Sequence, residues 1–139
     1  MKNFKHSRFL LFSLFFACLI LLALSFYLIQ HRPFDSRILP VRFMIGDKIG
    51  IEINDSALTF GRAVPGTSLH RGVFVDNPYA FPITVRVFIN KTITSYVFAP
   101  NATFIISPGA RYEVPFVLAV PSNAEAGNYS GTILFEFWK

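Results

Sequence analysis

Residues 111–120 read RYEVPFVLAV, with an apolar side chain at every second position. Such a period of two is typical of a β-strand with one buried face. The same alternation recurs at two other places, at Ile49, Ile51 and Ile53 and at Ile83, Val85, Val87 and Ile89. We therefore expect the chain from residue 41 onward to fold mainly as half-buried strands.

Turn signals separate the alternating stretches at short intervals. The Pro-Gly pairs 65–66 and 108–109 offer the fixed φ of proline followed by a glycine that tolerates positive φ, as a type II turn requires. Asn77 precedes Pro78, and its side chain is expected to cap a strand end by bonding to nearby backbone. These turns predict short strands joined in close succession.

About eight strands and no helix are predicted in residues 41–139. In a chain of this length the pattern indicates an all-β fold, an antiparallel β-sandwich whose two sheets share one core. Pro82 and Pro115 favour this sandwich over a closed barrel, because prolines in sheets occupy edge positions.

Several short motifs occur in a fixed order along this region. They are Leu58-Thr59-Phe60-Gly61, Val64-Pro65-Gly66, Asn77, Ser107-Pro108-Gly109, Val120-Pro121, and the set Ala126, Gly127, Tyr129 and Gly131. This order resembles an Ig-like module of archaeal and bacterial cell-envelope proteins over residues 56–137. The resemblance implies an Ig-like antiparallel β-sandwich and no particular activity. It also implies that Tyr129 acts as a tyrosine corner, its hydroxyl bonded to a loop carbonyl, with plain core packing as the alternative.

Residues 9–29 form an apolar run without any charged side chain. A helix of this length rises about 30 Å, which matches the hydrocarbon core of a bilayer. Three basic residues precede the run, which favours a cytoplasmic N-terminus and a single pass through the cell membrane. A cleavable signal peptide is the alternative, since Ala23 and Ser25 are suitably small. Apolar residues continue to Ile29, however, and favour an uncleaved signal anchor.

The predicted organisation has four parts: a cytoplasmic tip (1–8), a transmembrane signal anchor (9–29), a spacer (30–40) and an extracytoplasmic β-sandwich (41–139). Pro33 and Pro40 mark the spacer as short and stiff. Cys18, within the span, is the only cysteine, so no intrachain disulfide can form. An extracytoplasmic domain without disulfides is more typical of archaeal or bacterial envelopes than of eukaryotic secretion.

Four asparagines head an N-x-[ST] triplet, the acceptor sequence for N-linked glycans, and all four follow the span: Asn54, Asn90, Asn101 and Asn128. Turns and strand edges are rich in Asn and Thr for purely structural reasons, which is the alternative explanation. We expect at least one real glycan, and therefore a glycoprotein whose C-terminal domain is extracytoplasmic.

The sequence shows few of the side-chain patterns that catalysis requires. The three histidines, His6, His31 and His70, form no cluster by spacing, and His70 is expected on an exposed strand. We therefore predict no catalytic residues, no cofactor, no metal site and no small-molecule substrate, and expect the protein not to be an enzyme. The formal charge of +5 is spread without a block of like charge, which argues against a nucleic-acid partner.

Alternation leaves four aromatic and basic side chains on outward faces: Phe74, Arg86, Phe88 and Trp138. Aromatic residues and arginine are enriched where proteins bind each other, so this set is the predicted contact face. Cover by loops or by a strand switch is the alternative.

Two functions fit the sequence. In the first, a membrane-anchored Ig-like module has a structural or protein-binding role in the cell envelope, with a protein partner there and the membrane contacted through residues 9–29. In the second, it is an accessory or chaperone-like subunit that binds a partner strand by β-augmentation at an open sheet edge. The layout of helix and sandwich is also similar to that of archaellum stator proteins.

Overall fold

The computed structural model describes the backbone of residues 3–47 and 57–139, and the side chains of residues 11–47 and 57–139. The chain divides into two compact units, Met1–Arg32 and Pro33–Lys139. The strand expected around Ile51 and the acceptor triplet at Asn54 lie outside the described residues.

The first unit holds a single helix, α1 (Asn3–Gln30). Between Leu11 and Gln30 it is long and apolar enough to cross a membrane, and its side chains there are exposed. The helix ends just before Pro33, a residue that cannot continue it, and the N–H of His31 still donates to the carbonyl of Tyr27 at 3.2 Å. An N-terminal helix of this kind has the length and composition of a membrane anchor or a signal sequence.

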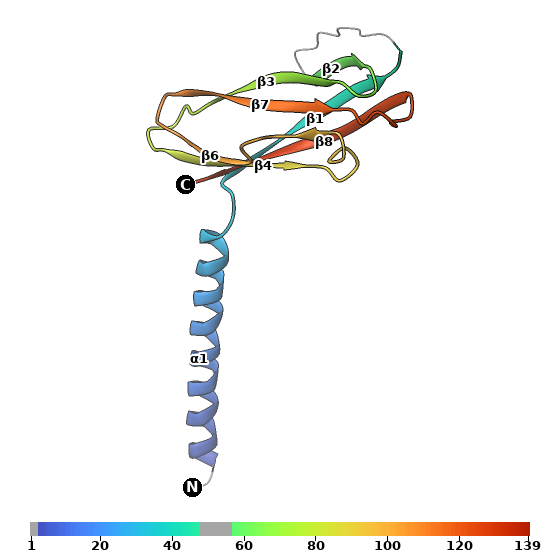
Figure 1. The fold of residues 1–139 in the computed structure, drawn as a ribbon. Coiled ribbons are helices and arrows are strands. Elements are labelled where there is room, and N and C mark those ends of the chain that lie inside the picture. The colour runs from blue at the N-terminus through green and yellow to red at the C-terminus, as the bar shows by residue number, and fades with distance from the viewer. Residues whose placement is uncertain (1–2, 48–56) are drawn as a thin grey trace. The chain divides into compact units, whose positions relative to one another are not determined.

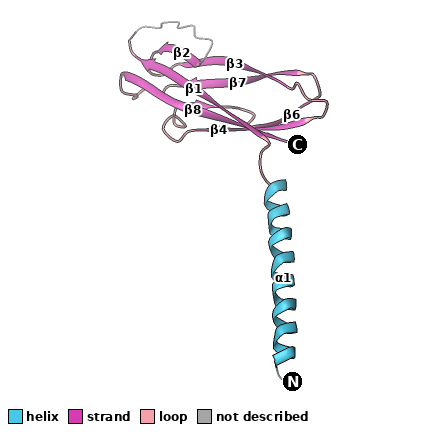
Figure 2. Ribbon diagram, turned by 180° about the vertical axis from the view of Figure 1, so that it is seen from behind, coloured by secondary structure: helices cyan, strands magenta, loops and turns pink. Residues whose placement is uncertain are grey.

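The second unit contains eight strands in its described part, arranged in two layers (Figures 1 and 2). They are β1 (Asp35–Ile45), β2 (Leu58–Ala63), β3 (Ser68–Asp76), β4 (Ile83–Ile89), β5 (Val97–Phe98), β6 (Thr103–Ile106), β7 (Arg111–Ala119) and β8 (Gly127–Trp138). The larger sheet has the order β2-β1-β8-β4-β6, and the smaller sheet has the order β3-β7-β5. The prediction of a β-rich domain of two sheets after an apolar helix is confirmed.

One pair of strands departs from the antiparallel prediction. β1 and β2 run parallel, from Val41 beside Leu58 to Ile45 beside Ala63, whereas the other described pairs are antiparallel. Parallel neighbours cannot be joined by a tight hairpin. Alternation and turn signals do not encode this direction.

The hydrophobic core lies between the two sheets and follows the predicted alternation. Val114, Phe116 and Leu118 of β7 are buried from one side, and Ile83, Val85 and Val87 of β4 are buried from the other. The rings of Phe116 and Phe135 meet across the sheets edge to face, with their centroids 6.2 Å apart. A one-residue slip of any of these strands would turn its apolar side chains toward water.

The structure places strand where a spacer was predicted. β1 begins at Asp35, inside the range 30–40, and includes Pro40. Pro40 pairs with Thr132 of β8, while pairing with β2 starts only at Val41. A residue without an N–H donor is tolerated there, because that side of β1 has no neighbour among the described strands.

The prolines of the other strands obey the same rule. Pro115 lies in β7, the middle strand of its sheet, and pairs with Gly72 of β3. On its other side β5 pairs only with Val117 and Leu118, so Pro115 has an open side as an edge residue does. Pro82 precedes β4 by one residue.

Both predicted Pro-Gly turns are confirmed. Gly66 and Gly109 have positive φ values of 82° and 68°. In each turn the fourth residue donates to the first: Thr67 N–H to the Val64 carbonyl at 3.1 Å, and Ala110 N–H to the Ser107 carbonyl at 3.1 Å.

Asn77 holds three backbone segments together, as its predicted capping role requires. Its buried side-chain Nδ2 lies 2.9–3.1 Å from the carbonyl oxygens of Phe81, Ile106 and Ser107, and its Oδ1 accepts from the Tyr79 N–H at 3.0 Å. Its main chain also accepts from Gly109 and donates to Ala110. The loops that follow β3 and β6 are therefore fixed to one side chain.

Tyr129 makes the contact that the Ig-like resemblance implies. Its hydroxyl donates to the carbonyl of Glu125 at 2.9 Å, and its ring stacks on Phe43 with centroids 5.2 Å apart. A hydrogen bond with the Tyr96 hydroxyl, followed by partial burial, raises the pKa of Tyr129. The residue therefore combines the loop contact with packing at the edge of the core.

We expect Asn77→Ala to lower the free energy of unfolding by about 2–4 kcal/mol, because the buried carbonyls lose their shared donor. Asn77→Asp should lower the free energy of unfolding by at least as much, since a negatively charged carboxylate would face the same carbonyl oxygens. Urea unfolding of the full chain in detergent, followed by the fluorescence of Trp138, measures both changes. The exposed Asn123→Ala is the matched control, and an equal effect of the two alanine variants would contradict the role of Asn77.

Candidate functional site

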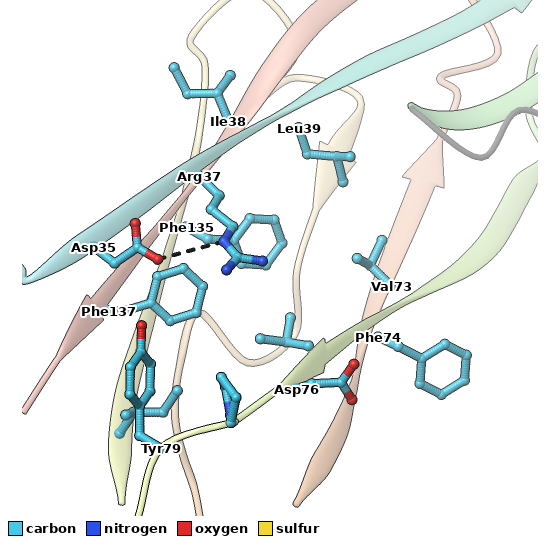
Figure 3. Close-up of a pocket in the computed structure, with 13 residues that line it drawn as sticks. Asp35, Arg37, Ile38, Leu39, Val73, Phe74, Asp76, Tyr79, Phe135 and Phe137 are labelled. Atoms are coloured by element: carbon cyan, nitrogen blue, oxygen red, sulfur yellow. Dashed lines mark ion pairs between the residues drawn. The ribbon is translucent and has the colours of Figure 1, made fainter. Parts of the chain in front are cut away.

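A cleft of about 320 Å³ opens between the first half of β1 and the second half of β3 (Figure 3). Apolar residues of both sheets line it, among them Leu39, Val73, Val75, Ile83, Phe135 and Phe137. Ile83, Phe135 and Phe137 belong to the buried core, so the cleft leads from the surface directly to the core.

The side chains of the two bordering strands divide between the cleft and the outer faces. Leu39 and Val73 point toward each other from β1 and β3, whereas Ile38 and Phe74 point away (Figure 3). Leu39 and Val73 are half-buried, which is less than their partners deeper in the core. The cleft therefore offers an apolar slot that one or two additional side chains would fill.

Charged groups lie along both walls. On β1, Arg37 Nε is 3.6 Å from Asp35 Oδ2, and the Arg37 guanidinium lies 5.7 Å from the centre of the Phe137 ring. On β3, Asp76 Oδ1 accepts from Arg111 Nε at 2.6 Å. That hydrogen bond lowers the pKa of Asp76 and raises the pKa of Arg111. Each arginine is largely exposed, so these pairs contribute little to stability.

The wall formed by β1 is also an open strand edge. β2 pairs with residues 41–45 of β1, and no described strand pairs with residues 35–40 on that side. The direction of the backbone groups follows from two hydrogen bonds. Gly46 N–H donates to Ala63 of β2, and Asn90 N–H donates to the Thr132 carbonyl of β8.

Successive residues of a strand point their N–H and C=O groups to opposite sides. Since Gly46 faces β2, the even-numbered residues of β1 face that side, and the odd-numbered ones bond to β8. Ser36 and Ile38 therefore direct their main-chain groups to the open edge, while the Pro40 carbonyl faces Leu58 at the start of β2. The N–H of Ser36 is held by Asp35 Oδ1 at 2.8 Å, which agrees with this direction.

Few ionisable side chains line the cleft. The ionisable side chains that line the cleft are Asp35, Arg37, Asp76 and Tyr79, a set without a nucleophile and base in contact. Among the described residues, no three His, Cys, Asp or Glu side chains are grouped as metal ligands. An apolar slot beside free main-chain groups is instead the arrangement that recognises an extended peptide.

The predicted contact face does not form a single surface. Phe74, 60% exposed, lies on the outer face of the smaller sheet, where the guanidinium of Arg111 is 5.5 Å from its ring centre. Arg86, Phe88 and Trp138 lie on the outer face of the larger sheet, with the Arg86 guanidinium 4.7 Å from the centre of the Trp138 ring. His70 is exposed on β3, as expected.

The sequence analysis missed the residues of the cleft wall. Leu39, Val41, Phe43 and Ile45 alternate as a half-buried strand does, and this signal begins inside the predicted spacer. Pro40 interrupts this alternation, and a proline between two apolar residues is also typical of the end of a linker, so the sequence does not distinguish the start of a strand from a spacer here.

Comparison with known proteins gives structural likeness only. No family model matches the chain, and no curated protein matches it in sequence. Its fold is similar to that of the DraE adhesin in complex with chloramphenicol succinate, with a TM-score of 0.41 and 12% identity over 77% of this chain and 97% of that chain. The AfaE-3 adhesin from Escherichia coli has a TM-score of 0.40 and 12% identity over 77% and 96% of the two chains.

An antigen and type I fimbria protein of Burkholderia pseudomallei has a TM-score of 0.35 and 11% identity, over 76% of this chain and 100% of that chain. These structural neighbours are two adhesins and a fimbria protein. The archaeal assignment and the likeness to archaellum stators stay predictions from the sequence layout.

We expect the Asp76 carboxyl to titrate below its ordinary value of 3.8 and to return toward that value in Arg111→Met. A lowered pKa means that the pair stabilises the fold above the ordinary pKa and loses this effect as the pH falls through the lowered one. Carboxyl ¹³C shifts of the full chain in micelles report the titration. Arg86→Met, remote from Asp76, is the control, and identical titration curves in wild type and Arg111→Met would show the ion pair to be absent in solution.

Proposed function

We propose that this chain is a membrane-anchored, protein-binding module of the cell envelope, with an Ig-like two-sheet domain outside the membrane. We further propose that it binds its partner by accepting an extended segment along the open edge of β1. One observation carries this proposal: the part of β1 that has no described strand on its outer side lies directly beside an apolar cleft that reaches the core. The protein is then a binding subunit and not an enzyme.

The main chain of β1 supplies the first half of such a site. Ile38 offers an N–H and a C=O to the edge, and Ser36 offers a carbonyl, whereas the Pro40 carbonyl already faces Leu58, the first residue of β2. A segment of about five residues would pair with these groups and continue the sheet past the start of β2. The Ser36 N–H, already bonded to Asp35, sets the limit of the pairing at that end.

The cleft supplies the second half. Alternate side chains of an added strand point to one face of the sheet, so the residue beside Leu39 would enter the apolar slot against Val73. Each buried methylene there contributes about 0.8 kcal/mol. The residue beside Arg37 would meet a positive charge, which favours an acidic side chain. The expected partner segment therefore joins an apolar and an acidic position two residues apart.

The proposed location rests on the N-terminal unit. α1 is apolar from Phe9 to Ile29, basic residues precede this apolar part, and apolar residues continue past the small residues that a signal peptidase would need. These features favour retention of the helix as an anchor, with residues 33–139 outside. An anchored domain of this kind meets its partner at the membrane surface.

The test removes one donor at the edge. Ile38→Pro deletes the N–H that faces the open side, a change already tolerated at Pro40, and leaves the bonds to β8 in place. With a photoreactive benzoylphenylalanine in place of Ser36 in the full-length, membrane-embedded protein, we expect adducts with a second protein. Their yield should fall about tenfold in Ile38→Pro, since one lost hydrogen bond costs about 1.4 kcal/mol.

Ile105→Pro is a matched control on the opposite edge of the same sheet. Ile105 has the same exposed fraction as Ile38, 69%, and its N–H also faces away from the neighbouring strand, because Val87 bonds to Ala102 in that ladder. This variant should keep the full yield of adducts. Equal loss in both variants, or adducts that join only parts of one chain, would contradict the proposal.

A further inference from the structure

We propose that Asn101 carries an N-linked glycan and that its first sugars cover Phe88 on the outer face of the larger sheet. The inference rests on the proposed extracytoplasmic location and is independent of the strand-accepting edge. It begins from an exposed apolar row on that face.

This row crosses three strands at one level. The register places Ile38 of β1 beside Leu134 of β8, and Leu134 beside Phe88 of β4. All three side chains share the outer parity of the sheet, opposite to the buried Val87 and Phe135. Phe88 is 49% exposed, and together with Ile105 of β6 the row gives a water-facing apolar surface. Surfaces of this kind on a soluble domain are usually covered by something.

The ladder between β4 and β6 leads toward Asn101 and Phe88. Thr84 pairs with Ile105, Arg86 pairs with Thr103, and the N–H of Val87 donates to the Ala102 carbonyl at 2.8 Å. Continued by one residue, this register sets Asn101 opposite Phe88 on the same outer parity. Asn101 and Thr103, the two required residues of the triplet, are both exposed.

The other described acceptor asparagines are placed differently. Asn90 follows the last residue of β4 and lines the same hollow as Phe88 and Leu134, but its Oδ1 is engaged: it accepts from the N–H and the hydroxyl of Thr92, at 3.0 and 3.1 Å. Asn128 lies on β8, where its register partner in β1 is Met44. Of the three, Asn101 is the one that the continued register sets on the strand next to Phe88, and Asn90 is the one on the same strand as Phe88.

A sugar ring suits this surface because its C–H groups form an apolar face that packs on an aromatic ring. Packing there would remove the exposed half of the Phe88 ring from water and keep the sugar hydroxyls hydrated. The same chemistry would extend over Leu134. A glycan at Asn101 therefore accounts for an apolar row that the fold itself leaves open.

The attachment is a group transfer from an oligosaccharide activated as a lipid-linked phosphate ester. The Asn101 Nδ2 forms a bond to the anomeric carbon of the first sugar. The bond from that carbon to the lipid phosphate oxygen breaks, the lipid phosphate leaves with the electron pair, and the amide proton passes to a base of the transferase. The electron count balances without an oxidant or reductant.

The experiment uses the full chain from its native host. Mass spectrometry of the peptide that contains Asn101 should show glycan mass, and Thr103→Ala should abolish it. In a background with Gln at residues 54, 90 and 128, enzymatic removal of the remaining glycan should lower the thermal midpoint by a few degrees. Phe88→Ala should remove most of this difference, whereas Ile105→Ala, an exposed residue on the same face, should preserve it.

Three results would overturn the inference: an unmodified Asn101 while other acceptors carry glycan, no glycan on any acceptor, or a midpoint change that is the same in Phe88→Ala and wild type. The second result would also remove the support that the acceptor triplets give to an outside location. None of them bears on crosslinking at the edge of β1, so the two proposals fail separately.

Discussion

The ladder between β1 and β8 is the interaction on which the rest of the domain depends. It pairs the first strand after the helix with the last strand of the chain, from Asp35 beside Phe137 to Ile45 beside Gly127, without a break in register. Residues about a hundred positions apart in sequence pair there, so the ladder joins the two ends of the domain and fixes the chain between them in one large loop. Its register also decides which side chains of β1 enter the core, because a shift by one residue would exchange Leu39 and Ile38.

That register explains why cleft and edge coincide. The odd-numbered residues of β1 bond to β8 through their main chain and point their side chains inward, so Leu39 and Arg37 form a wall of the cleft. The even-numbered residues direct their N–H and C=O groups to the side of β2. β2 covers this side only from Val41 onward. The unpaired main chain and the exposed part of the core are thus two consequences of one short strand. Asp35 and Pro40 reduce the number of free N–H donors at this edge. Asp35 accepts the Ser36 N–H, and Pro40 has no N–H.

The sequence predicts what local patterns encode. Alternation in residues 83–89 and 111–120 correctly assigns the buried faces of β4 and β7, and the Pro-Gly pairs correctly assign two turns, because side-chain period and φ preference are local properties. Sheet membership is a non-local property. Phe74 and Phe88 both alternate outward, yet they lie on different sheets, and no local signal distinguishes them.

The cleft could not be predicted from the sequence for a related reason. Its β1 wall carries a clear period of two, but the meaning of Pro40 depends on whether a neighbouring strand needs its N–H. That neighbour, β2, comes from a later part of the chain and runs parallel, which turns and alternation do not reveal. Open edges and the clefts beside them are properties of strand order, so they become visible only when the fold is known.

The two edges of the larger sheet differ in a way that bears on function. A sheet edge is a template for unwanted pairing, and proteins protect such edges with charges, prolines, bulges or bulky cover. At the β6 edge, Asn101 lies two residues before Thr103, where pairing with β4 starts, and the proposed glycan there would cover both Phe88 and the start of β6. At the β1 edge, no described acceptor asparagine lies beside residues 35–40. β8 and β4 lie between β1 and β6, so this edge is three strand spacings, or about 14 Å, from the strand that Asn101 precedes. A domain built only as a spacer would gain from cover at both edges. A glycan at one edge and an apolar cleft beside the other would suit a domain that binds one partner strand and prevents unwanted pairing elsewhere.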